Sequence, residues 1–163
     1  MERKIIRGVL VYVNFEGRQI MIHRDHSEKD IHYQKWVASG GGLELGETLD
    51  QCAEREVLEE LGIKVKPIRR GRVFFNNEGR TFNGQPKDWD YQCEIYTATA
   101  IERPRDKTDK GDRVELFDSR DILSLPQHEC DKYIWLLSQQ KSSFNVEFRY
   151  SGENMSSFEV KFE

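Results

Sequence analysis

Apolar residues along this chain recur with two periods, one typical of β-strands and one typical of helices. Residues 5–13 are rich in β-branched side chains, and a Glu16-Gly17 turn joins them to a second such segment at 19–23, which predicts a β-hairpin. Shorter apolar segments follow, bounded by polar residues, glycine or proline. Further strands are therefore expected at 36–39, at 64–76 with an interruption at 69–71, at 91–100 and at 114–117.

A helix is expected at 49–61. Thr48 and Gln51 have the spacing of a capping box, in which the hydroxyl and the amide side chain satisfy the first backbone groups of a helix. Gly62 supplies the left-handed position that commonly ends a helix. The apolar positions that would pack against a sheet are Leu49, Cys52, Ala53, Val57, Leu58 and Leu61.

A second helix is expected after a long loop. Residues 76–87 contain two glycines and a proline and predict a loop, and loops of this length are often functional. Pro126 suits the first turn of the helix, where a missing backbone N–H costs nothing. The side chains expected on its buried side are Tyr133, Ile134, Leu136 and Leu137.

The chain ends in a predicted β-hairpin. Residues 144–150 and 158–162 alternate between apolar and polar positions around a polar turn at 151–154. Strands divided by two helices favour an α/β (α+β) protein with a mixed sheet between the helices. We expect residues 1–163 to form a single domain, because no repeat or linker divides them.

Three carboxylates are concentrated on one side of the first predicted helix. Glu56, Glu59 and Glu60 are spaced i, i+3 and i+4, so they share a face and repel one another. A solvated acidic face is the ordinary interpretation, and Arg55 could pair with Glu59, but an exposed pair contributes only about 0.5 kcal/mol. A divalent cation bound to a phosphorylated substrate explains the cluster better.

The segment from Gly41 to Ile63 carries a motif of fixed spacing. It fills all nine specified positions of the Nudix box, and the order of elements around it is also similar to that of the Nudix hydrolases. The resemblance implies the Nudix fold, a mixed sheet in an α/β/α sandwich. The nine matching residues are Gly41, Glu47, Arg55, Glu56, Val57, Glu59, Glu60, Gly62 and Ile63.

The resemblance also implies roles for the charged residues of the motif. Glu56, Glu59 and Glu60 would bind Mg²⁺, with Mn²⁺ as a substitute, at a diphosphate linkage that water attacks. Glu47 would complete this cluster or help to deprotonate the water. Arg55 would orient a glutamate and reduce the repulsion between the acids.

Residues outside the acidic helix complete the expected site. Gly40, Gly41 and Gly42 let the backbone approach metal and phosphates, and they equally suit a tight turn. Members of the family often use a further acid before a late strand, and Asp112 is the candidate here. Glu94 and Glu115 are alternatives for that metal ligand.

The second half of the chain resembles the MutT-type oxidised-purine triphosphatases, which include 8-oxo-dGTP diphosphatases. In those relatives an acid near the start of the last helix reads the purine, and Glu129 lies closest, although an acid there also suits the helix dipole. Pro126 stands where an aromatic residue often precedes that acid, a departure from the pattern. Trp89 and Phe75 are candidate stacking surfaces or core aromatics.

The expected reaction is hydrolysis of a nucleoside triphosphate, such as 8-oxo-dGTP or another oxidised dNTP, to the monophosphate and pyrophosphate. A nucleotide sugar or a dinucleoside polyphosphate is the alternative substrate. A Nudix-fold regulatory module that only binds nucleotides is a further alternative, against which the complete set of glutamates argues.

Composition narrows the partners and the compartment. The net charge is −4, and acidic and basic residues are interspersed along the chain, so no broad basic surface is predicted. We therefore expect a nucleotide substrate and no nucleic acid polymer. No apolar run approaches the roughly 20 residues that cross a bilayer, so no membrane partner is expected. Three widely spaced cysteines and the absence of a signal-peptide pattern favour a cytoplasmic protein with reduced thiols. A homodimer is left open.

Overall fold

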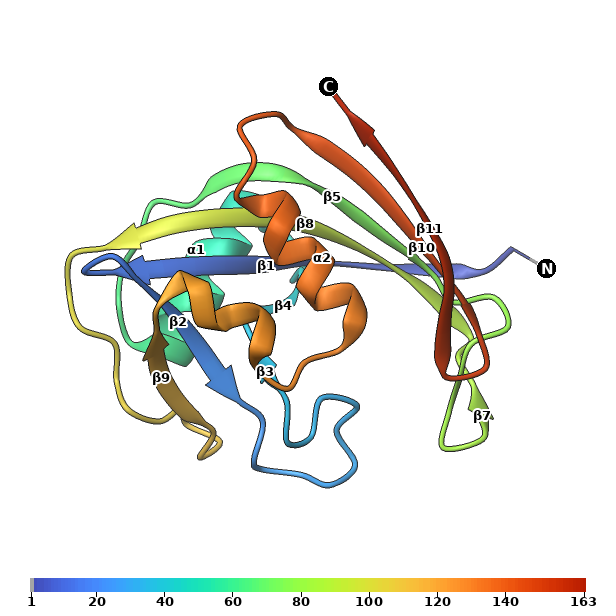
Figure 1. Ribbon diagram of the computed structural model, residues 1–163, viewed down its shortest axis with the longest axis horizontal. Coiled ribbons are helices and arrows are strands. Elements are labelled where there is room, and N and C mark those ends of the chain that lie inside the picture. The colour runs from blue at the N-terminus through green and yellow to red at the C-terminus, as the bar shows by residue number, and fades with distance from the viewer. Residues whose placement is uncertain (1) are drawn as a thin grey trace.

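The computed structural model describes residues 2–163 and has a nine-stranded sheet between helices (Figure 1). The strand order along the sheet is β11-β10-β5-β8-β1-β2-β3, with β4 paired to β1 and β9 paired to β2, and β6 and β7 form a separate two-stranded hairpin. The strands are β1 (Lys4–Phe15), β2 (Arg18–His23), β3 (Trp36–Val37), β4 (Ser39–Gly42), β5 (Ile68–Asn76), β6 (Thr81–Phe82), β7 (Gln85–Pro86), β8 (Trp89–Ala100), β9 (Arg113–Phe117), β10 (Phe144–Ser151) and β11 (Asn154–Phe162). The helices are α1 (Leu49–Leu61), the 3₁₀ helix η1 (Ser119–Ser124) and α2 (Glu129–Ser138).

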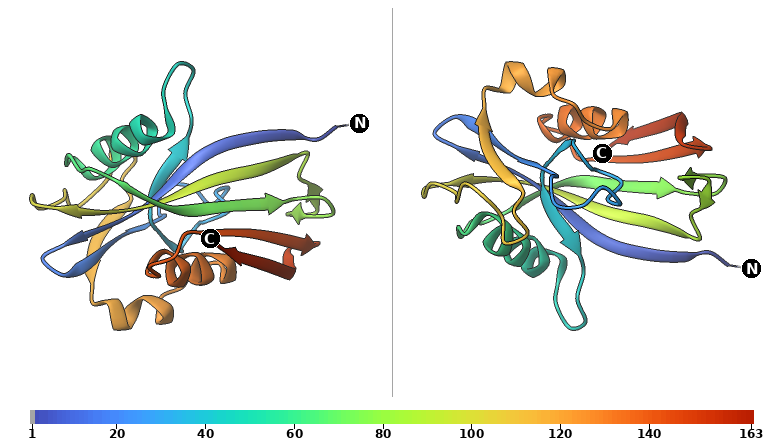
Figure 2. Two further views of the ribbon diagram at one scale, coloured as in Figure 1. Left: turned by 90° about the horizontal axis from the view of Figure 1, so that it is seen from above. Right: turned by 90° about the horizontal axis from the view of Figure 1, so that it is seen from below.

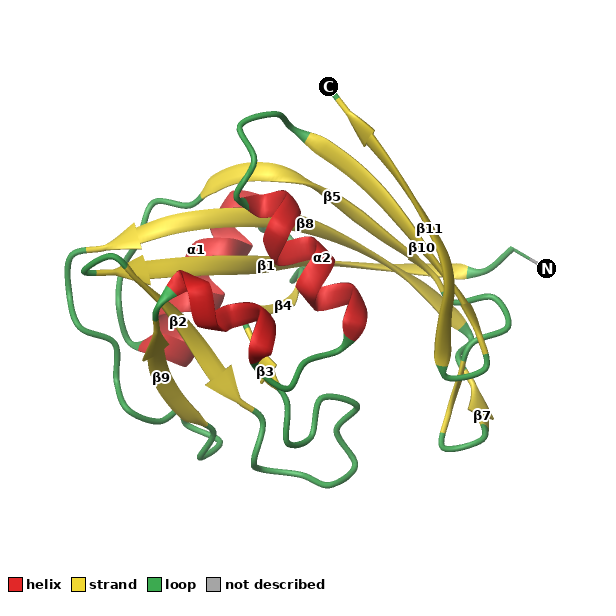
Figure 3. Ribbon diagram, in the orientation of Figure 1, coloured by secondary structure: helices red, strands yellow, loops and turns green. Residues whose placement is uncertain are grey.

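Two parallel pairs make the sheet mixed, as expected. β1 pairs with β8 and β10 pairs with β5 in parallel, whereas the other neighbours are antiparallel. Figure 2 shows α1 on one face of the sheet and α2 on the other, beside the C-terminal hairpin that forms the edge of the sheet, and Figure 3 sets these two red helices against the yellow strands. The α/β/α sandwich and its terminal hairpin are therefore confirmed.

Both faces of the central strand β1 are buried. Val9, Val11 and Val13 pack in the core beneath α1, whereas Leu10 and Tyr12 belong to the core on the α2 side. This division follows from the two-residue period of a strand, and burial on both sides explains the continuous apolar run. All three cysteines are buried and unpaired.

The first helix has the boundaries and caps that its sequence predicts. Thr48 Oγ1 accepts a hydrogen bond of 3.1 Å from the Gln51 backbone N–H, and the Gln51 side chain accepts one of 2.9 Å from the Thr48 N–H. Gly62 ends the helix with φ 72°. Leu58 was expected to pack against the sheet but is 43% exposed, because Val57 and Leu61 already fill the inward-facing positions.

After α1 the chain departs from expectation in the next strand, in the long loop and at the start of α2, and the last strand begins at Asn154 and not at residue 158. The strand expected from residue 64 begins only at Ile68, with its register shift between Arg69 and Gly71. The loop 76–87 contains the small hairpin of β6 and β7. α2 begins at Glu129, because Pro126 belongs to the preceding loop, where its carbonyl accepts a 2.8 Å hydrogen bond from Trp36 N–H.

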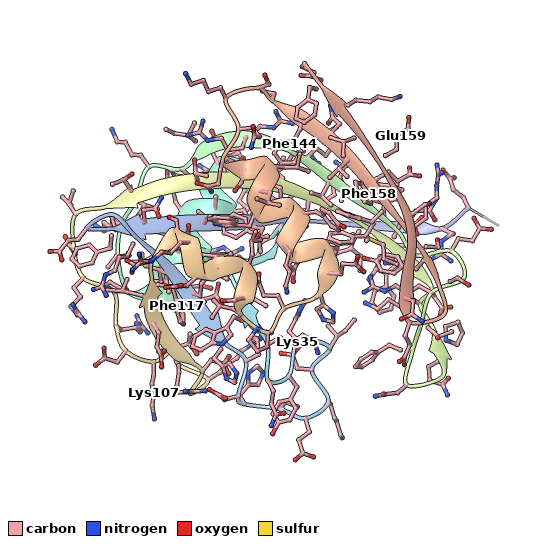
Figure 4. The ribbon with its side chains drawn as sticks, viewed as in Figure 1. Lys35, Lys107, Phe117, Phe144, Phe158 and Glu159 are labelled. Atoms are coloured by element: carbon pink, nitrogen blue, oxygen red, sulfur yellow. The ribbon has the colours of Figure 1, made fainter. Side chains whose placement is uncertain are left out.

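The C-terminal hairpin is fastened to α2 by aromatic contacts. Phe158 of β11 has its ring centroid 4.7 Å from that of Tyr133 on α2 and 5.8 Å from that of Phe148 on β10 (Figure 4). Leu136, expected on the buried side of this helix, is 40% exposed. Because β10 and β11 are the edge strands of the sheet, these contacts hold α2 against that edge.

Candidate active site

The glycine strand β4 brings the acidic helix against the sheet. Gly41 pairs with Val9 and Gly40 pairs with Leu10 of β1. A Cβ atom on Gly41 would lie 2.3 Å from Glu56 Oε1, so only glycine lets that carboxylate reach the backbone here. The strand expected at 36–39 is thus two short strands, and its glycines form the floor beneath α1.

Arg55 lies at the centre of the acidic cluster. Its Nη2 and Nε donate to both oxygens of Glu47 at 2.7 and 3.0 Å, and its Nη1 donates to Glu56 at 2.8 Å and to Glu59 at 3.2 Å. The hydrogen bonds from Arg55 lower the pKa of Glu47 to about 2, and the same contacts raise the pKa of the guanidinium. Arg55 is therefore the counterion that holds acids of the loop and of the helix together.

Glu60 points in a different direction from Glu59. Its Oε1 accepts hydrogen bonds of 2.8 Å from both Ser39 Oγ and Gly40 N–H. Burial raises the pKa of Glu60 to about 7 in spite of these bonds, and burial also raises the pKa of Glu56. Glu59 is more open, with 56% of its side chain exposed.

The acids fit a hard divalent cation by their chemistry. Within residues 2–163 no three His, Cys, Asp or Glu side chains converge as a finished metal-binding cluster. Glu56 and Glu60 nevertheless present carboxylate oxygens whose ionisation is opposed by burial, and a bound cation would reverse that penalty. Carboxylate oxygens of this kind are donors that suit a hard divalent cation.

The candidate acids outside the motif lie in other clusters. Asp112 Oδ1 accepts from the backbone N–H groups of Asp25 and His26 at 2.7 and 3.0 Å, and its carboxylate contacts the His26 ring nitrogen at 2.9 Å. Glu94 is bonded to two arginines of β5. Glu115 is exposed, 3.6 Å from an arginine on its own strand. None of these recorded contacts reaches Arg55 or the glutamates of α1.

A cavity of about 370 Å³ opens beside the glycine strand. Gly40 and Gly41 form part of its wall, so it adjoins the backbone that Glu56 and Glu60 contact. Aromatic side chains cover another part of the wall, and Trp89 is 37% exposed there. The aromatic lining residues of the sheet are Tyr12, Phe75, Trp89 and Tyr91.

The acid in this cavity is Asp131, two residues beyond the predicted Glu129. Glu129 is exposed at the first position of α2 and is absent from the wall, whereas Asp131 lines it. Burial raises the pKa of Asp131 to about 7. Asp131 stands three residues before the buried Ile134, on the same face of the helix, so the helical phase could have identified it.

Two histidines form a neutral part of the wall. His128 contacts the Ile31 carbonyl oxygen at 2.9 Å through Nε2, and its ring meets that of His32 edge to face at 4.9 Å. Burial, and then the proximity of His128, lowers the pKa of His32 to about 3, and burial lowers the pKa of His128. Lys35, in the loop below the start of α2 in Figure 4, adds to the latter effect.

Comparison with known proteins places this arrangement in a family. A family model described as the NUDIX domain matches residues 4–137. The chain belongs to the NUDIX family. Among its relatives, an oxidized purine nucleoside triphosphate hydrolase of Danio rerio is 31% identical over 123 residues, which cover 74% of this chain and 73% of that protein.

Further relatives of this Nudix protein differ in their named substrates. An NAD-capped RNA hydrolase, NudC of Actinobacillus succinogenes, is 40% identical over 67 residues, which cover 40% of this chain and 25% of that protein. The crystal structure of a MutT protein from Bacillus halodurans has a TM-score of 0.77 at 21% identity, covering 96% of this chain and 97% of that one. At this identity, the similarity to the MutT structure shows a shared fold and nothing more.

Membership of the family makes the protein an enzyme, a Nudix pyrophosphohydrolase that acts on nucleotide-type substrates. Nudix hydrolases generally use divalent metal ions, in agreement with the oxygen donors of α1. No helix within residues 2–163 is both long and apolar enough to cross a membrane.

Proposed function

We propose that this Nudix hydrolase cleaves a nucleoside triphosphate to the monophosphate and pyrophosphate, with an oxidised purine as the base. The observation that carries the proposal is that the backbone of Gly40 and Gly41 lies between the glutamates and the cavity. These residues touch Glu56 and Glu60 on one side and line the base-sized cavity on the other. A diphosphate at the glutamates therefore has a pocket of about 370 Å³ next to it, a volume suited to a small ligand.

Glu56, Glu59 and Glu60 are the residues that would hold Mg²⁺, or Mn²⁺ in its place. When bound, such a cation neutralises phosphate oxygens and helps to orient the attacking water. In the reaction, the water oxygen forms a bond to phosphorus, the bond to the bridging oxygen breaks, and a carboxylate takes the proton. Pyrophosphate leaves and the nucleoside monophosphate remains.

Arg55 and Glu47 act as positioning residues in this proposal. The two hydrogen bonds between them fix the guanidinium, whose Nη1 then holds Glu56 and Glu59. Glu47 comes from the loop before α1, so it ties the loop conformation to the orientation of the helix acids. Gly42 contributes its carbonyl oxygen, 3.1 Å from Arg55 Nη2.

The walls of the cavity support a purine base. Phe75, Trp89 and Tyr91 offer aromatic surface for a flat ring, and Asp131 offers a carboxyl group to a polar edge. Burial raises the pKa of Asp131 and so favours its protonated form, which can donate a hydrogen bond as well as accept one. The relative from Danio rerio, named for oxidised purine nucleoside triphosphates, supports the same base class.

A substrate panel with matched variants tests the proposal. Wild-type enzyme is assayed with Mg²⁺ on normal and oxidised dNTPs, a nucleotide sugar and a dinucleoside polyphosphate, and released pyrophosphate and phosphate are measured. Glu59→Gln should abolish most turnover, whereas Glu54→Gln, an exposed position on the same helix, should retain it. Unchanged metal binding and turnover in Glu59→Gln, or strong preference for a substrate other than a triphosphate, would refute the proposal.

A further inference from the structure

Two cations line the cavity without an ion pair, and the charge of Arg80 acts at longer range on the Asp131 carboxyl of the same wall. Arg80 and Lys87 flank the small hairpin of β6 and β7, and both contribute to the cavity wall. Among residues 2–163 no carboxylate oxygen lies within 4 Å of either side chain. Burial, and then the charge of Arg80, lowers the pKa of Lys87, so the two cations oppose each other inside the cavity.

The guanidinium of Arg80 is held in a fixed plane. Its central carbon lies 3.7 Å from the ring centroid of Tyr150, and its Nη1 donates to Asn77 Oδ1 at 3.1 Å. Asn77 is itself fixed, because its backbone N–H donates to Asp90 and its side chain donates to the Trp89 carbonyl, at 2.8 and 2.9 Å. One of the five guanidinium N–H groups is thus used, and the other donors are available.

Backbone hydrogen bonds hold the segment that carries these cations. Thr81 N–H donates to the Gly152 carbonyl at 2.9 Å, which ties the segment to the turn of the C-terminal hairpin. Lys87 N–H donates to the Arg80 carbonyl at 3.0 Å, which closes the small hairpin. The donors are therefore presented by an ordered structure, and a ligand would not need to order them.

We propose that Arg80, supported by Lys87, donates hydrogen bonds to oxygen acceptors of the base and so selects carbonyl-bearing purines over aminopurines. This inference rests on the proposed function and deepens it. A guanidinium fork matches adjacent acceptors on a purine, whereas the amino group of adenine would present donors to donors. Oxidation at C8 adds a carbonyl oxygen, which a guanidinium N–H can bind, but it also puts a hydrogen on N7, so in an oxidised purine Arg80 would bind carbonyl oxygens alone.

A second phosphate on the substrate would also satisfy two cations, but the surroundings favour a ring. Phe75, Trp89 and Tyr91 contribute aromatic surface to the same cavity, and Lys87 Nζ lies 5.3 Å from the Trp89 ring centroid. A flat heterocycle gains contact with such walls, whereas a phosphate would lose its hydration against them.

The test compares two substrates whose bases differ in the group at C6 and in the hydrogen that N1 carries beside a carbonyl. dITP carries a carbonyl at C6 where dATP carries an amino group, and kcat/KM is measured for both with Mg²⁺. We expect wild-type enzyme to prefer dITP by on the order of tenfold, as one good fork contact allows. Arg80→Met should reduce the preference to below about threefold by slowing dITP alone. Arg120→Met removes an exposed charge elsewhere and should leave the preference intact.

Further variants separate specificity from structure. Arg80→Lys keeps the charge but lacks the fork, so its preference should lie between those of wild type and Arg80→Met. Lys87→Met tests the same wall if Arg80→Met unfolds. An equal loss of kcat/KM for both substrates would make Arg80 a structural residue and overturn the inference. A preference for a dinucleoside polyphosphate that disappears in Arg80→Met would overturn it in favour of a second phosphate site.

Binding measurements distinguish failure of this inference from failure of the proposed function. Calorimetry with dIMP and dAMP reports base preference without any turnover. If wild-type enzyme hydrolyses no triphosphate but binds dIMP more tightly through Arg80, the wall has the proposed selectivity and the proposed reaction is wrong. If it hydrolyses triphosphates but binds both monophosphates equally, the reaction stands and the role of Arg80 is refuted.

Discussion

Three consecutive glycines provide a graded test of the site, because a methyl group added to each would meet a different neighbour. A Cβ atom on Gly41 would lie 2.3 Å from Glu56 Oε1, and one on Gly40 would lie 2.3 Å from the Val9 carbonyl oxygen. A Cβ atom on Gly42 would have nothing within 4 Å. Alanine at Gly41 should therefore disturb the chemistry, and alanine at Gly40 should disturb the fold. Alanine at Gly42 should disturb neither.

The Gly41→Ala change should impair activity far more than stability. Ordinary Cβ contacts begin at 3.4 Å, so the Glu56 carboxylate must move by about 1 Å. This group ends a flexible side chain, so the fold can accommodate the shift, but the 2.8 Å contact with Arg55 is lost. A displacement of this size at a reacting centre costs roughly 100-fold in rate. We expect kcat/KM to fall about 100-fold and the free energy of unfolding to change by less than ~1 kcal/mol.

The two flanking variants are the controls. In Gly40→Ala the clash is with backbone of the central strand β1, which cannot turn aside, and overpacking of this kind costs about 1–3 kcal/mol. Gly42 is exposed and has no left-handed backbone conformation, so Gly42→Ala should match wild type in both properties.

Urea unfolding and Mg²⁺-dependent pyrophosphate release, measured on all three variants, check these expectations. Activity that survives in Gly41→Ala would show that the position of Glu56 does not matter. Equal losses in Gly41→Ala and Gly42→Ala would show that glycine flexibility, and not the approach of the carboxylate, is what the site requires. Either result would refute the reasoning.

Three further predictions concern charge in the two halves of the site. Arg55→Lys should lower kcat/KM at least about tenfold, because a lysine cannot hold both Glu47 oxygens; steady-state rates equal to wild type would contradict this. Burial raises the pKa of Asp131 from 3.8 to about 7, so folded wild type becomes less stable as the pH rises through this interval, whereas Asp131→Asn does not. The variant should therefore equal wild type in stability near pH 4 and exceed it by roughly 2–4 kcal/mol above pH 7. Urea unfolding at both pH values checks the sign, and a constant difference would contradict it. Saturating Mg²⁺ should raise the Tm of wild type but not of a Glu56→Gln, Glu60→Gln double variant, as measured by thermal unfolding, because only the folded acids bind the cation; equal shifts would place the metal elsewhere.

The acidic helix could be predicted to the residue because its signals are local. The capping box at Thr48 and the left-handed Gly62 each act within one turn of the helix end, and both function as the sequence indicates. The inward turn of Glu60 could not be predicted. It depends on Ser39 and Gly40 of a strand that the fold brings against the helix.

The cavity wall was less accessible to sequence reasoning, for two physical reasons. Pro126 predicts a helix start three residues before the observed one, because its carbonyl accepts a hydrogen bond from Trp36 N–H in the preceding loop. The later start of α2 places Asp131, and not Glu129, in the cavity wall. Arg80 stands in a segment without periodicity. Its place in the cavity depends on stacking with Tyr150, seventy residues later in the chain.

The cavity wall contains residues of the motif and residues from outside it. The backbone of Gly40 and Gly41 adjoins both the carboxylates and the cavity, so under the proposed function we expect changes there to alter catalysis and base binding together. Asp131 and Arg80 line the same cavity from α2 and from the 77–87 segment, outside the motif, and neither contacts the acids of α1. Under the proposed function, substitutions at Asp131 and Arg80 should therefore change base selectivity without disturbing the carboxylates of α1.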